Sequence, residues 1–391
     1  MTVPSPETNP LPSAASFFRP TWADIDVAAF RHNLRTMAGC LAPGVKTIVV
    51  LKANGYGHGA VPLARAAAAE SGVSLWGFGV SSIEEGLLLR ESGFRHPVLI
   101  LGSLFPFENF VPALEHDLIP AVASLAAARA LGGIATERGR RADVHVKVDT
   151  GMGRIGVSPQ AAAQIVDAVL ENRSLHLEGI FTHLAHAESE EDTQRQLDVF
   201  QAVAEEARRK KGEPLLAHAA NSAATFLYPR SHGDAVRPGL SLYGIYPNES
   251  LRARVSLQPV MTWKTRIVFL KTVKGGTAVS YGATFRTSRP SRLATLPVGY
   301  ADGYRRILSN RAFVLVKGRR CPVLGRVTMD QIVVDVTDVP AVDVGEEVVL
   351  LGRQGKDAVT AEELAGWAET IPYEIVCGVS VRVPRRYVNV S

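Results

Sequence analysis

The stretch DVHVKVDTGMGRIGVSPQAAAQIVDAVLENRSLHLEGIFTH, residues 143–183, has the most informative pattern in the chain. Its two ends, Asp143 to Asp149 and Leu177 to His183, are short and rich in β-branched residues, as parallel strands buried on both faces are. Between them, Ser158-Pro159 opens an amphipathic stretch, with proline at a favoured first-turn position. The segment therefore predicts a strand–helix–strand unit with parallel strands.

The same alternation continues on both sides of this stretch. Glu190 to Lys211 predicts a long helix, and Ser81 to Glu84 predicts a capping box that opens the helix EEGLLLRE. Six further runs predict strands: TIVVL (Thr47 to Leu51), LWGFGV (Leu75 to Val80), PVLILG (Pro97 to Gly102), LIPAVAS (Leu118 to Ser124), LLAHA (Leu215 to Ala219) and DAVRPGL (Asp234 to Leu240). Eight strands with helical crossovers predict an α/β fold, a (β/α)8 barrel of the TIM type. The alternative is an open doubly wound sheet, but no GxGxxG follows a first strand here.

The pattern changes near Leu257, after which short alternating segments are separated by turn residues. These segments are WKTRIVFLKTV, RLATLPVG, FVLVKG, QIVVDVTDV and EEVVLLG. They predict a C-terminal, mostly antiparallel β domain over residues 257–391, after a barrel over residues 19–256. Residues 1–18 are rich in proline, serine and threonine, and we expect a disordered N-terminal extension there.

The composition is that of an ordinary globular protein. The chain has 391 residues, 46% of them hydrophobic, and a net charge of +5. Its lysines and arginines are scattered, so we expect no nucleic-acid partner. Its three cysteines form neither a zinc pattern nor a disulfide framework, so we expect no metal. The absence of a signal peptide or a long apolar run predicts a cytoplasmic protein without membrane contact.

Cations and small polar residues follow the predicted strands at their carboxyl ends, where (β/α)8 barrels bind their ligands. They are Lys52, Asp149, Arg154, His183, Asn221-Ser222 and Arg237-Pro238-Gly239, with Lys147 inside the fifth strand. This set predicts an anionic ligand, with a phosphate after strands seven and eight. Lys52 follows an apolar strand, and partial desolvation would free its amine as a nucleophile. Taken alone, a strand-end lysine is more often an ordinary solvent-exposed residue.

VVLKANGYGHG (Val49 to Gly59) resembles the lysine motif of the alanine racemases, which are fold-type III enzymes dependent on pyridoxal phosphate (PLP). Similar motifs run in the same order from Arg19 to Tyr387: RPTWADID (Arg19 to Asp26), VKVDTGMGRIG (Val146 to Gly156), FTHLAHAE (Phe181 to Glu188), AANSAA (Ala219 to Ala224), RPGLSLYG (Arg237 to Gly244), VSYGATF (Val279 to Phe285), PVGYADG (Pro297 to Gly303), VTMDQ (Val327 to Gln331) and IPYE (Ile371 to Glu374). The resemblance implies a barrel, a C-terminal β domain and a homodimer.

The resemblance also implies two bases, one on each face of the substrate. Lys52 would be the Schiff-base lysine of PLP and the acid/base group on one face of the substrate, and Tyr281 of the partner subunit would serve the other face. Tyrosine is a weak base at neutral pH and needs a supporting neighbour, which matches His183, itself linked to Arg237. Arg237 would face the pyridine nitrogen and disfavour its protonation, which weakens the electron sink.

The remaining site residues carry over from the same motifs. Lys147 matches a family lysine that is often carbamylated, and the resulting anion would pair with Arg154, which contacts the substrate carboxylate. Met329 would complete the carboxylate site, and Tyr300 and Asp330 would line the entrance. The residues implied to hold the cofactor, mostly at its phosphate, are Tyr56, Asn221, Ser222, Tyr373 and the backbone amides of Gly239 and Leu240.

These motifs predict PLP-dependent racemisation of L- and D-alanine, which supplies D-alanine for peptidoglycan. A racemase for serine or lysine is the alternative, although Tyr300 and Tyr373 suggest a narrow pocket. A fold-type III decarboxylase uses a catalytic cysteine in the C-terminal domain, but Cys321 and Cys377 lie in no such motif. A non-catalytic PLP-binding protein would be a single barrel without a β domain.

Overall fold

The computed structural model describes residues 18–390, and the extension predicted for residues 1–18 lies outside the described residues apart from Phe18. The chain divides into two compact units. Of the described residues, one unit holds 26–260 and 389–390, and the other holds 18–25 and 261–388.

The first unit is a barrel of eight parallel strands, in the order β8-β7-β6-β5-β4-β3-β2-β9. The strands are β2 (Lys46–Val50), β3 (Leu75–Val80), β4 (Val98–Ile100), β5 (Ile119–Val122), β6 (Ala142–Lys147), β7 (Leu175–Phe181), β8 (Leu216–His218) and β9 (Ala235–Val236). Two backbone hydrogen bonds connect the end strands, from Asp234 to the Ala217 carbonyl at 2.8 Å and from Arg237 to that of Ala220 at 2.9 Å. The predicted (β/α)8 barrel is confirmed.

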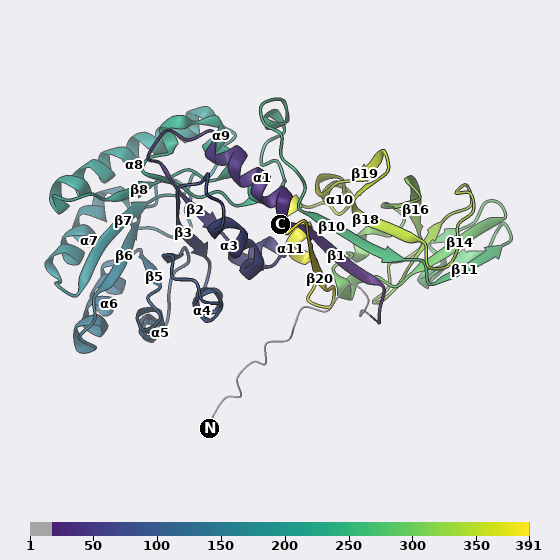
Figure 1. Ribbon diagram of the computed structural model, residues 1–391, viewed down its shortest axis with the longest axis horizontal. Coiled ribbons are helices and arrows are strands. Elements are labelled where there is room, and N and C mark those ends of the chain that lie inside the picture. The colour runs from purple at the N-terminus through teal and green to yellow at the C-terminus, as the bar shows by residue number, and fades with distance from the viewer. Residues whose placement is uncertain (1–17, 391) are drawn as a thin grey trace, which may run out of the picture. The chain divides into compact units, whose positions relative to one another are not determined.

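Helices flank this sheet along its length (Figure 1). They are α1 (Val27–Ala38), α2 (Lys52–Tyr56), α3 (Ala60–Ala68), α4 (Ile83–Glu91), α5 (Phe110–Glu115), α6 (Leu125–Glu137), α7 (Pro159–Glu171), α8 (Glu190–Lys211) and α9 (Ser222–Leu227), with 3-10 turns at η1 (Phe107–Asn109), η2 (Pro229–Ser231), η3 (Leu240–Tyr243) and η4 (Glu249–Ala253). One apolar layer inside the barrel joins side chains from several strands, which closes the interior as a packed core. Its buried members are Ile48, Trp76, Leu99, Ile119, Leu216 and Ala235.

The predicted helix starts are partly confirmed. Ser158 caps α7 with Pro159 in the first turn, and α8 spans the predicted residues. The capping box predicted at Ser81 to Glu84 is wrong. Ser82 is the N-cap of α4 and its hydroxyl accepts from the amide of Glu85, but the Glu85 carboxylate accepts from the amide of Ser81 and not from that of Ser82. Two serines precede two glutamates there, so the spacing alone fits either Ser81 with Glu84 or Ser82 with Glu85. Within residues 18–390, no helix combines the length and apolar character needed to cross a membrane.

The second unit is a mostly antiparallel sheet, as predicted, in the order β11-β14-β17-β16-β15-β18-β10-β1-β20 with β19 on β18. Its strands are β1 (Thr21–Asp26), β10 (Met261–Arg266), β11 (Phe269–Val273), β14 (Ser291–Leu296), β15 (Phe313–Val316), β16 (Arg319–Leu324), β17 (Ile332–Asp335), β18 (Glu347–Gln354), β19 (Asp357–Val359) and β20 (Arg385–Val388), and the separate pair β12 (Ala278–Val279) and β13 (Phe285–Arg286). Its helices and 3-10 turns are α10 (Ala361–Trp367), α11 (Pro372–Gly378), η5 (Tyr281–Ala283), η6 (Tyr300–Asp302) and η7 (Arg306–Leu308).

Strand β1 differs from the expected division of the chain. We expected residues 19–256 to belong together, but β1 pairs antiparallel with β10, so that Thr21 lies opposite Thr265. The physical reason is a long-range backbone ladder, which joins segments about 240 residues apart in the chain. No periodicity within TWADID itself indicates that partner.

Candidate active site

Lys52 begins a short left-handed turn at the carboxyl end of β2. The four residues that follow it, Ala53 to Tyr56, have φ angles of 53, 52, 61 and 52°. Left-handed backbone costs a residue with a Cβ roughly 1–2 kcal/mol, so this turn is strained. Lys52 itself is half-buried at the end of the strand.

Two side chains hold this turn in place. The Glu85 carboxylate accepts hydrogen bonds from the amides of Ala53 at 2.6 Å and Ser81 at 2.7 Å, so it connects the turn to the loop after β3. The Asn54 side chain accepts from the amide of Ala60 at 2.9 Å and thereby anchors the start of α3. Glu85 was not predicted as a site residue, because its only local signal in the sequence is its place near the start of a helix.

A cradle of hydroxyls and amides lies after β8 and β9, where a phosphate was predicted. The Ser222 hydroxyl accepts from the amides of Gly239 at 2.9 Å and Ser241 at 3.3 Å. The Ser241 hydroxyl is buried and has no hydrogen-bond partner among the described residues. Asn221 is the N-cap of α9. Ser241 is a second cradle residue that the sequence pattern missed, because its motif, RPGLSLYG, suggested only the amides of Gly239 and Leu240.

Gly239 closes this cradle against Tyr56. A Cβ on Gly239 would overlap the Tyr56 hydroxyl, so only glycine allows that hydroxyl to reach the cradle. The Tyr56 ring is held in turn by Tyr243, with ring centroids 4.7 Å apart, and the Tyr243 hydroxyl donates to the Val50 carbonyl at 2.9 Å. Uncharged donors of this kind bind a phosphate through hydrogen bonds.

We expect Gly239→Ala to weaken phosphate-ester binding. The added methyl would displace the Tyr56 hydroxyl, and overpacking of this size corresponds to about a ten- to hundredfold loss of affinity. Titration with PLP, followed by absorbance, measures the effect. Gly133→Ala is the matched control, since a Cβ there meets no atom within 4 Å. Equal affinities for the two variants would contradict the cradle.

Arg237 is buried beneath this rim, and all of its hydrogen bonds go to neutral acceptors. One terminal nitrogen donates to His218 Nδ1 at 2.5 Å and to the His218 carbonyl at 2.9 Å, and the other donates to the carbonyls of Thr182 at 2.6 Å and Ala219 at 3.0 Å. The sequence implied a link between Arg237 and His183, but within residues 18–390 the structure pairs the guanidinium with His218 instead. The fold therefore holds a cation that no described carboxylate neutralises.

Four cations act on each other around His183. Burial, followed by the charges of Arg237, Lys52, Arg154 and Lys147, lowers the pKa of His183 to about 3. Burial, followed by the charges of Arg154, Arg237 and Lys52, lowers the pKa of Lys147 to about 8. The Lys147 amine lies 3.5 Å from the Leu101 carbonyl and 5.4 Å from the centre of the Phe181 ring. The structure thus brings the predicted barrel cations together in one electrostatic neighbourhood.

The free energy of unfolding should fall as the pH drops from about 6.5 to about 5. Burial is the largest cause that lowers the pKa values of His145, His183 and His218, the first two to about 3. In this window the unfolded chain binds more protons than the folded chain, so each histidine contributes a slope of about 1.4 kcal/mol per pH unit. Urea unfolding at several pH values measures the slope of the unfolding free energy against pH. His183→Gln should lower this slope by the contribution of one histidine. A pH-independent free energy would contradict this expectation.

Arg154 is exposed on the loop after β6, and two side chains shape that loop. The Asp149 carboxylate accepts from the amides of Gly151, Met152 and Gly153, at 3.0, 2.8 and 3.1 Å. The buried Gln196 donates to the Thr150 hydroxyl at 3.1 Å and accepts from the amide of Ala185 at 2.9 Å, which connects the loops after β6 and β7. Gln196 was missed because it lies within a long helix whose pattern shows only amphipathicity.

Tyr281 lies in the second unit, on the turn between β12 and β13. Its side chain is 75% exposed. The turn has positive φ angles at Ser280, Gly282 and Ala283, and the Ser280 hydroxyl donates to the Arg326 carbonyl at 2.6 Å. An exposed tyrosine on a conformationally constrained turn suits a group presented to another surface.

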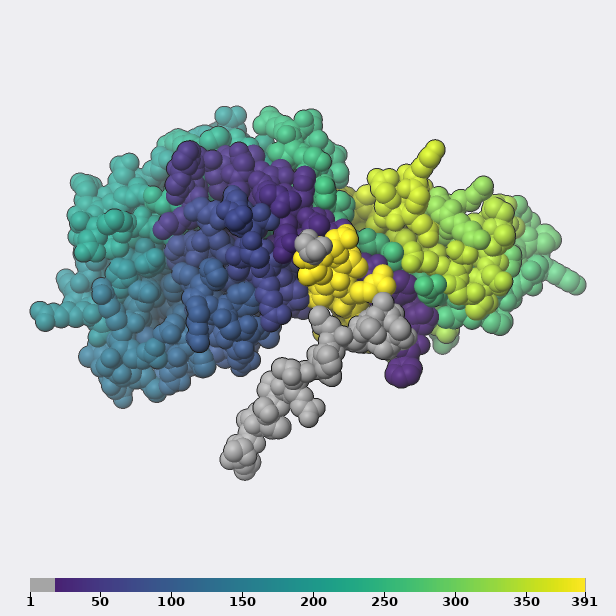
Figure 2. All heavy atoms as spheres, viewed as in Figure 1, coloured from purple at the N-terminus to yellow at the C-terminus, as the bar shows by residue number. Residues whose placement is uncertain are grey.

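The other predicted residues of this unit lie on neighbouring segments. The amide of Tyr300 donates to the Thr328 carbonyl at 3.0 Å, and the Asp330 carboxylate accepts from Arg382 at 2.7 Å. Met329 is 53% exposed, Tyr300 43% and Tyr373 38%. Tyr373 belongs to α11, and the last part of the chain, drawn in yellow, is at the surface in Figure 2. These side chains form an exposed, largely apolar set that the sequence attributed to one site.

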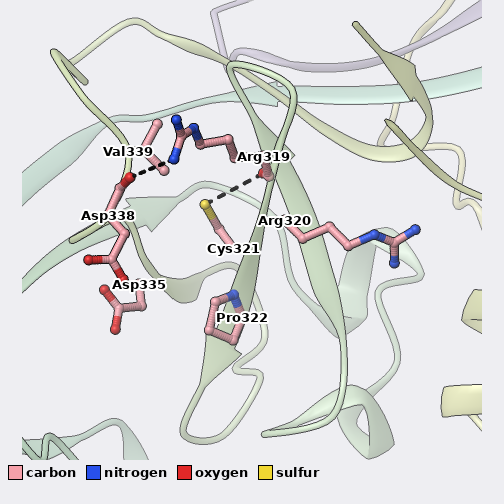
Figure 3. A pocket seen from close by; sticks show the side chains of 7 residues that line it. All are labelled: Arg319, Arg320, Cys321, Pro322, Asp335, Asp338 and Val339. Atoms are coloured by element: carbon pink, nitrogen blue, oxygen red, sulfur yellow. Dashed lines mark hydrogen bonds between the residues drawn. The ribbon is translucent and has the colours of Figure 1, made fainter. Parts of the chain in front are cut away.

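Cys321, one of the two cysteines considered for a decarboxylase, is poorly placed for catalysis. Cys321 lies in a cavity of about 360 Å³ lined by Arg319, Arg320, Pro322, Asp335, Asp338 and Val339 (Figure 3). Its thiol is buried and lies 3.7 Å from the Arg319 carbonyl. Burial, followed by the charge of Asp335, raises the pKa of Cys321 to about 12, so the thiolate needed for catalysis is scarce at neutral pH.

The barrel rim has the donor set that PLP requires. It offers an amine at Lys52, a buried cation at Arg237, and a cradle in which the Ser241 hydroxyl has no partner among the described residues. Glycine at 239 is the only residue whose size leaves the Tyr56 hydroxyl at this cradle. The residues therefore fit the cofactor: Lys52 would be its attachment point, and the cradle would hold its phosphate.

Comparisons with known proteins agree with this geometry. The family model described as "Alanine racemase, N-terminal domain" matches residues 25–247, and "Alanine racemase, C-terminal domain" matches residues 260–387. The chain is 45% identical to "Alanine racemase" of Halothermothrix orenii, over 95% of this chain and 97% of the relative. It is 47% identical to that of Symbiobacterium thermophilum, over 94% and 97%. It also resembles the solved alanine racemase of Clostridium difficile, with a TM-score of 0.89, 36% identity and coverage of 95% and 97%. The chain therefore belongs to the alanine racemase family.

Proposed function

We propose that this chain interconverts L- and D-alanine with PLP as its cofactor, through two bases on opposite faces of the substrate. The observation that carries the proposal is the cluster of Lys52, Lys147, Arg154 and Arg237, whose charges all lower the pKa of His183. A rim of cations beside a neutral hydroxyl and amide cradle suits an anionic cofactor and a substrate carboxylate. When bound, PLP delocalises the negative charge that proton loss leaves on the substrate α-carbon.

Lys52 acts as the base on one face of the substrate. Lys52 is half-buried, and its charge acts on His183 and Lys147 together with those of Arg154 and Arg237. The strained turn after Lys52 fixes the backbone at this point, so the amine has a defined direction of approach. Lys52 both attaches the cofactor and moves a proton to or from the α-carbon.

Tyr281 of a second copy acts as the base on the other face. The support is its exposure of 75%, together with the exposed Tyr300, Met329, Ile371 and Tyr373 of the same unit. Apolar side chains at such exposure are typical of a surface that another chain covers. We therefore propose a homodimer in which each active site combines the barrel of one chain with the β domain of its partner.

Arg237 controls how strongly the cofactor withdraws electrons. Its guanidinium is a donor only and carries a charge that no described carboxylate neutralises, so it opposes protonation of a ring nitrogen placed beside it. A weaker electron sink shortens the life of the carbanion and limits side reactions such as decarboxylation. Arg154 and the Met329 amide bind the substrate carboxylate.

Carbamylation of Lys147 would change the electrostatics of this rim. With its pKa lowered to about 8, the amine is neutral often enough to add CO2, which yields a carbamate and one proton. The lysine would then attract Arg154 instead of repelling it. We expect bicarbonate to raise the activity by about tenfold over CO2-free buffer, and intact-mass analysis to show one added CO2. Lys147→Gln should be insensitive to bicarbonate, and a wild-type enzyme without the adduct would contradict the idea.

We place this activity in the cytoplasm, where it would supply D-alanine for the cell wall, and the free cysteines at 40, 321 and 377 fit a reducing compartment. The test is purified protein with PLP, a single L-amino acid and D2O, followed by chiral chromatography. We expect both enantiomers of alanine to carry deuterium at the α-carbon. Faster exchange of serine or lysine would favour the broader racemase, and release of CO2 would favour a decarboxylase.

A further inference from the structure

The hydrogen bond between Arg237 and His218 determines which nitrogen of His218 carries the proton. A guanidinium has only donors, so His218 Nδ1, at 2.5 Å from the Arg237 nitrogen, accepts and carries no hydrogen. A second bond from the same nitrogen to the His218 carbonyl, at 2.9 Å, fixes the ring relative to the guanidinium. The His218 ring also stacks on Phe181, with centroids 5.0 Å apart and planes 8° from parallel.

The position of the hydrogen on His218 also determines which nitrogen of a second histidine, His145, carries its hydrogen. A neutral His218 without a hydrogen on Nδ1 carries it on Nε2, and this nitrogen lies 2.9 Å from Nδ1 of His145 on β6. His145 Nδ1 therefore accepts, and the proton of His145 is on its own Nε2. That Nε2 has no hydrogen-bond partner among residues 18–390, and the His145 ring lies 5.4 Å from the ring of Trp76. Each hydrogen bond in the chain thus points away from Arg237.

The surroundings exclude the other protonation states. A proton on His218 Nδ1 would face the Arg237 donor directly, and an imidazolium would place a second cation beside it. Both rings are completely buried, and burial, followed by the charge of Arg237, lowers the pKa of each. The arrangement therefore has one stable pattern of hydrogens.

We propose that His145 and His218 are positioning residues that form a one-way hydrogen-bond relay, which holds the Arg237 guanidinium at the cofactor while leaving its charge intact. An aspartate or glutamate in place of His218 would also hold the guanidinium, but it would neutralise the charge. Two neutral imidazoles fix the geometry without that effect. The consequence for PLP rests on the proposed function, whereas the hydrogen pattern does not.

The hydrogen pattern is tested by 15N NMR of the full-length protein labelled at histidine, with and without PLP. We expect His145 and His218 both to carry hydrogen on Nε2 and none on Nδ1 at neutral pH. Assignment uses the single-residue variants of each histidine. Hydrogen on Nδ1 of either residue, or an imidazolium, would overturn the relay even if PLP binding proved absent.

The positioning role is tested with two variants of His145. Asparagine keeps an acceptor near the position of Nδ1, whereas leucine removes it and leaves the His218 N–H without a partner. We expect His145→Leu to shift the visible absorbance of bound PLP and to lower kcat about ten- to a hundredfold with KM changed less than about threefold. His145→Asn should keep most of the wild-type absorbance of bound PLP and most of the wild-type kcat.

His232→Leu is the matched control for loss of a buried histidine. His232 is 4% exposed, and its Nε2 lies 2.8 Å from the Thr225 carbonyl, outside the relay. It should lose thermal stability while its PLP absorbance and kcat stay as in wild type. If His145→Leu and His232→Leu lower the melting temperature alike and both leave the absorbance unchanged, the positioning role is refuted. A wild-type protein that binds no PLP would instead count against the proposed function.

Discussion

We expect Lys52→Ala to lower alanine racemisation by about 10⁴-fold or more, because one residue both attaches the cofactor and serves as a base. The visible absorbance band of lysine-bound PLP should disappear as well. The left-handed turn after residue 52 is held by Glu85 and Asn54, so the substitution should leave the fold unchanged. Activity is measured by chiral chromatography and folding by circular dichroism.

Lys46→Ala is the control for this variant. Lys46 is exposed at the opposite end of the same strand, where its backbone amide donates to the Asp234 carbonyl at 2.9 Å. This variant should keep both the absorbance band and the activity. If Lys52→Ala retained the band, Lys52 would not be the attachment point, and the assignment of the whole rim would be wrong.

Tyr281→Phe should lower racemisation by about 10²- to 10⁴-fold, because it removes the proton donor and acceptor on one face. The loss should be unequal for the two enantiomers, since Lys52 still exchanges the α-proton on its own face. Exchange in D2O, followed separately from L- and D-alanine, measures this asymmetry. Equal losses for both hands would argue against two bases.

Tyr304→Phe is the matched control in the same unit. The Tyr304 ring is buried, and its hydroxyl has no hydrogen-bond partner among the described residues, so its removal should leave activity unchanged. Loss of activity in Tyr304→Phe equal to that in Tyr281→Phe would indicate that the loss arises from damage to the β domain.

The sharing of sites between subunits is testable with the same variants. If Tyr281 reaches the partner's site, a mixed dimer of Lys52→Ala and Tyr281→Phe chains contains one intact site and one doubly altered site. Unfolding and refolding the two variants together in equal amounts should then recover about a quarter of wild-type activity, since half of the dimers are mixed. Recovery of no activity, with mixed dimers detected by mass, would contradict a site built from two chains.

Much of the fold could be predicted because its signals are local. Strand β6 has a valine at every second residue, and β7 ends in the apolar residues Ile180 and Phe181. Helix α8 repeats apolar residues at helical spacing, and Ser158-Pro159 is a helix start that needs no distant partner. Burial of such runs follows from hydrophobicity alone. The place of Lys52 at a strand end follows from the same reasoning.

Apart from the capping box at Ser81 to Glu84, the errors and omissions involve distant partners. Strand β1 pairs with β10, which lies beyond the whole barrel in sequence. Glu85 reaches the amide of Ala53, and Gln196 connects the loops after two different strands. These bonds form because buried backbone groups need partners, but spacing in the chain does not identify which partner each one finds.

The order of strands and helices, the position of Lys52 at the rim and the residues shared with a known family follow from neighbouring residues and motifs in the amino-acid sequence. The left-handed turn after Lys52, the pairing of Arg237 with His218 rather than His183, and the hydrogen bond from His218 to His145 arise only in the folded chain. His145 and His218 are 73 residues apart in the chain. Their hydrogen bond exists because the barrel brings β6 and β8 within reach and excludes the water that would otherwise satisfy both rings.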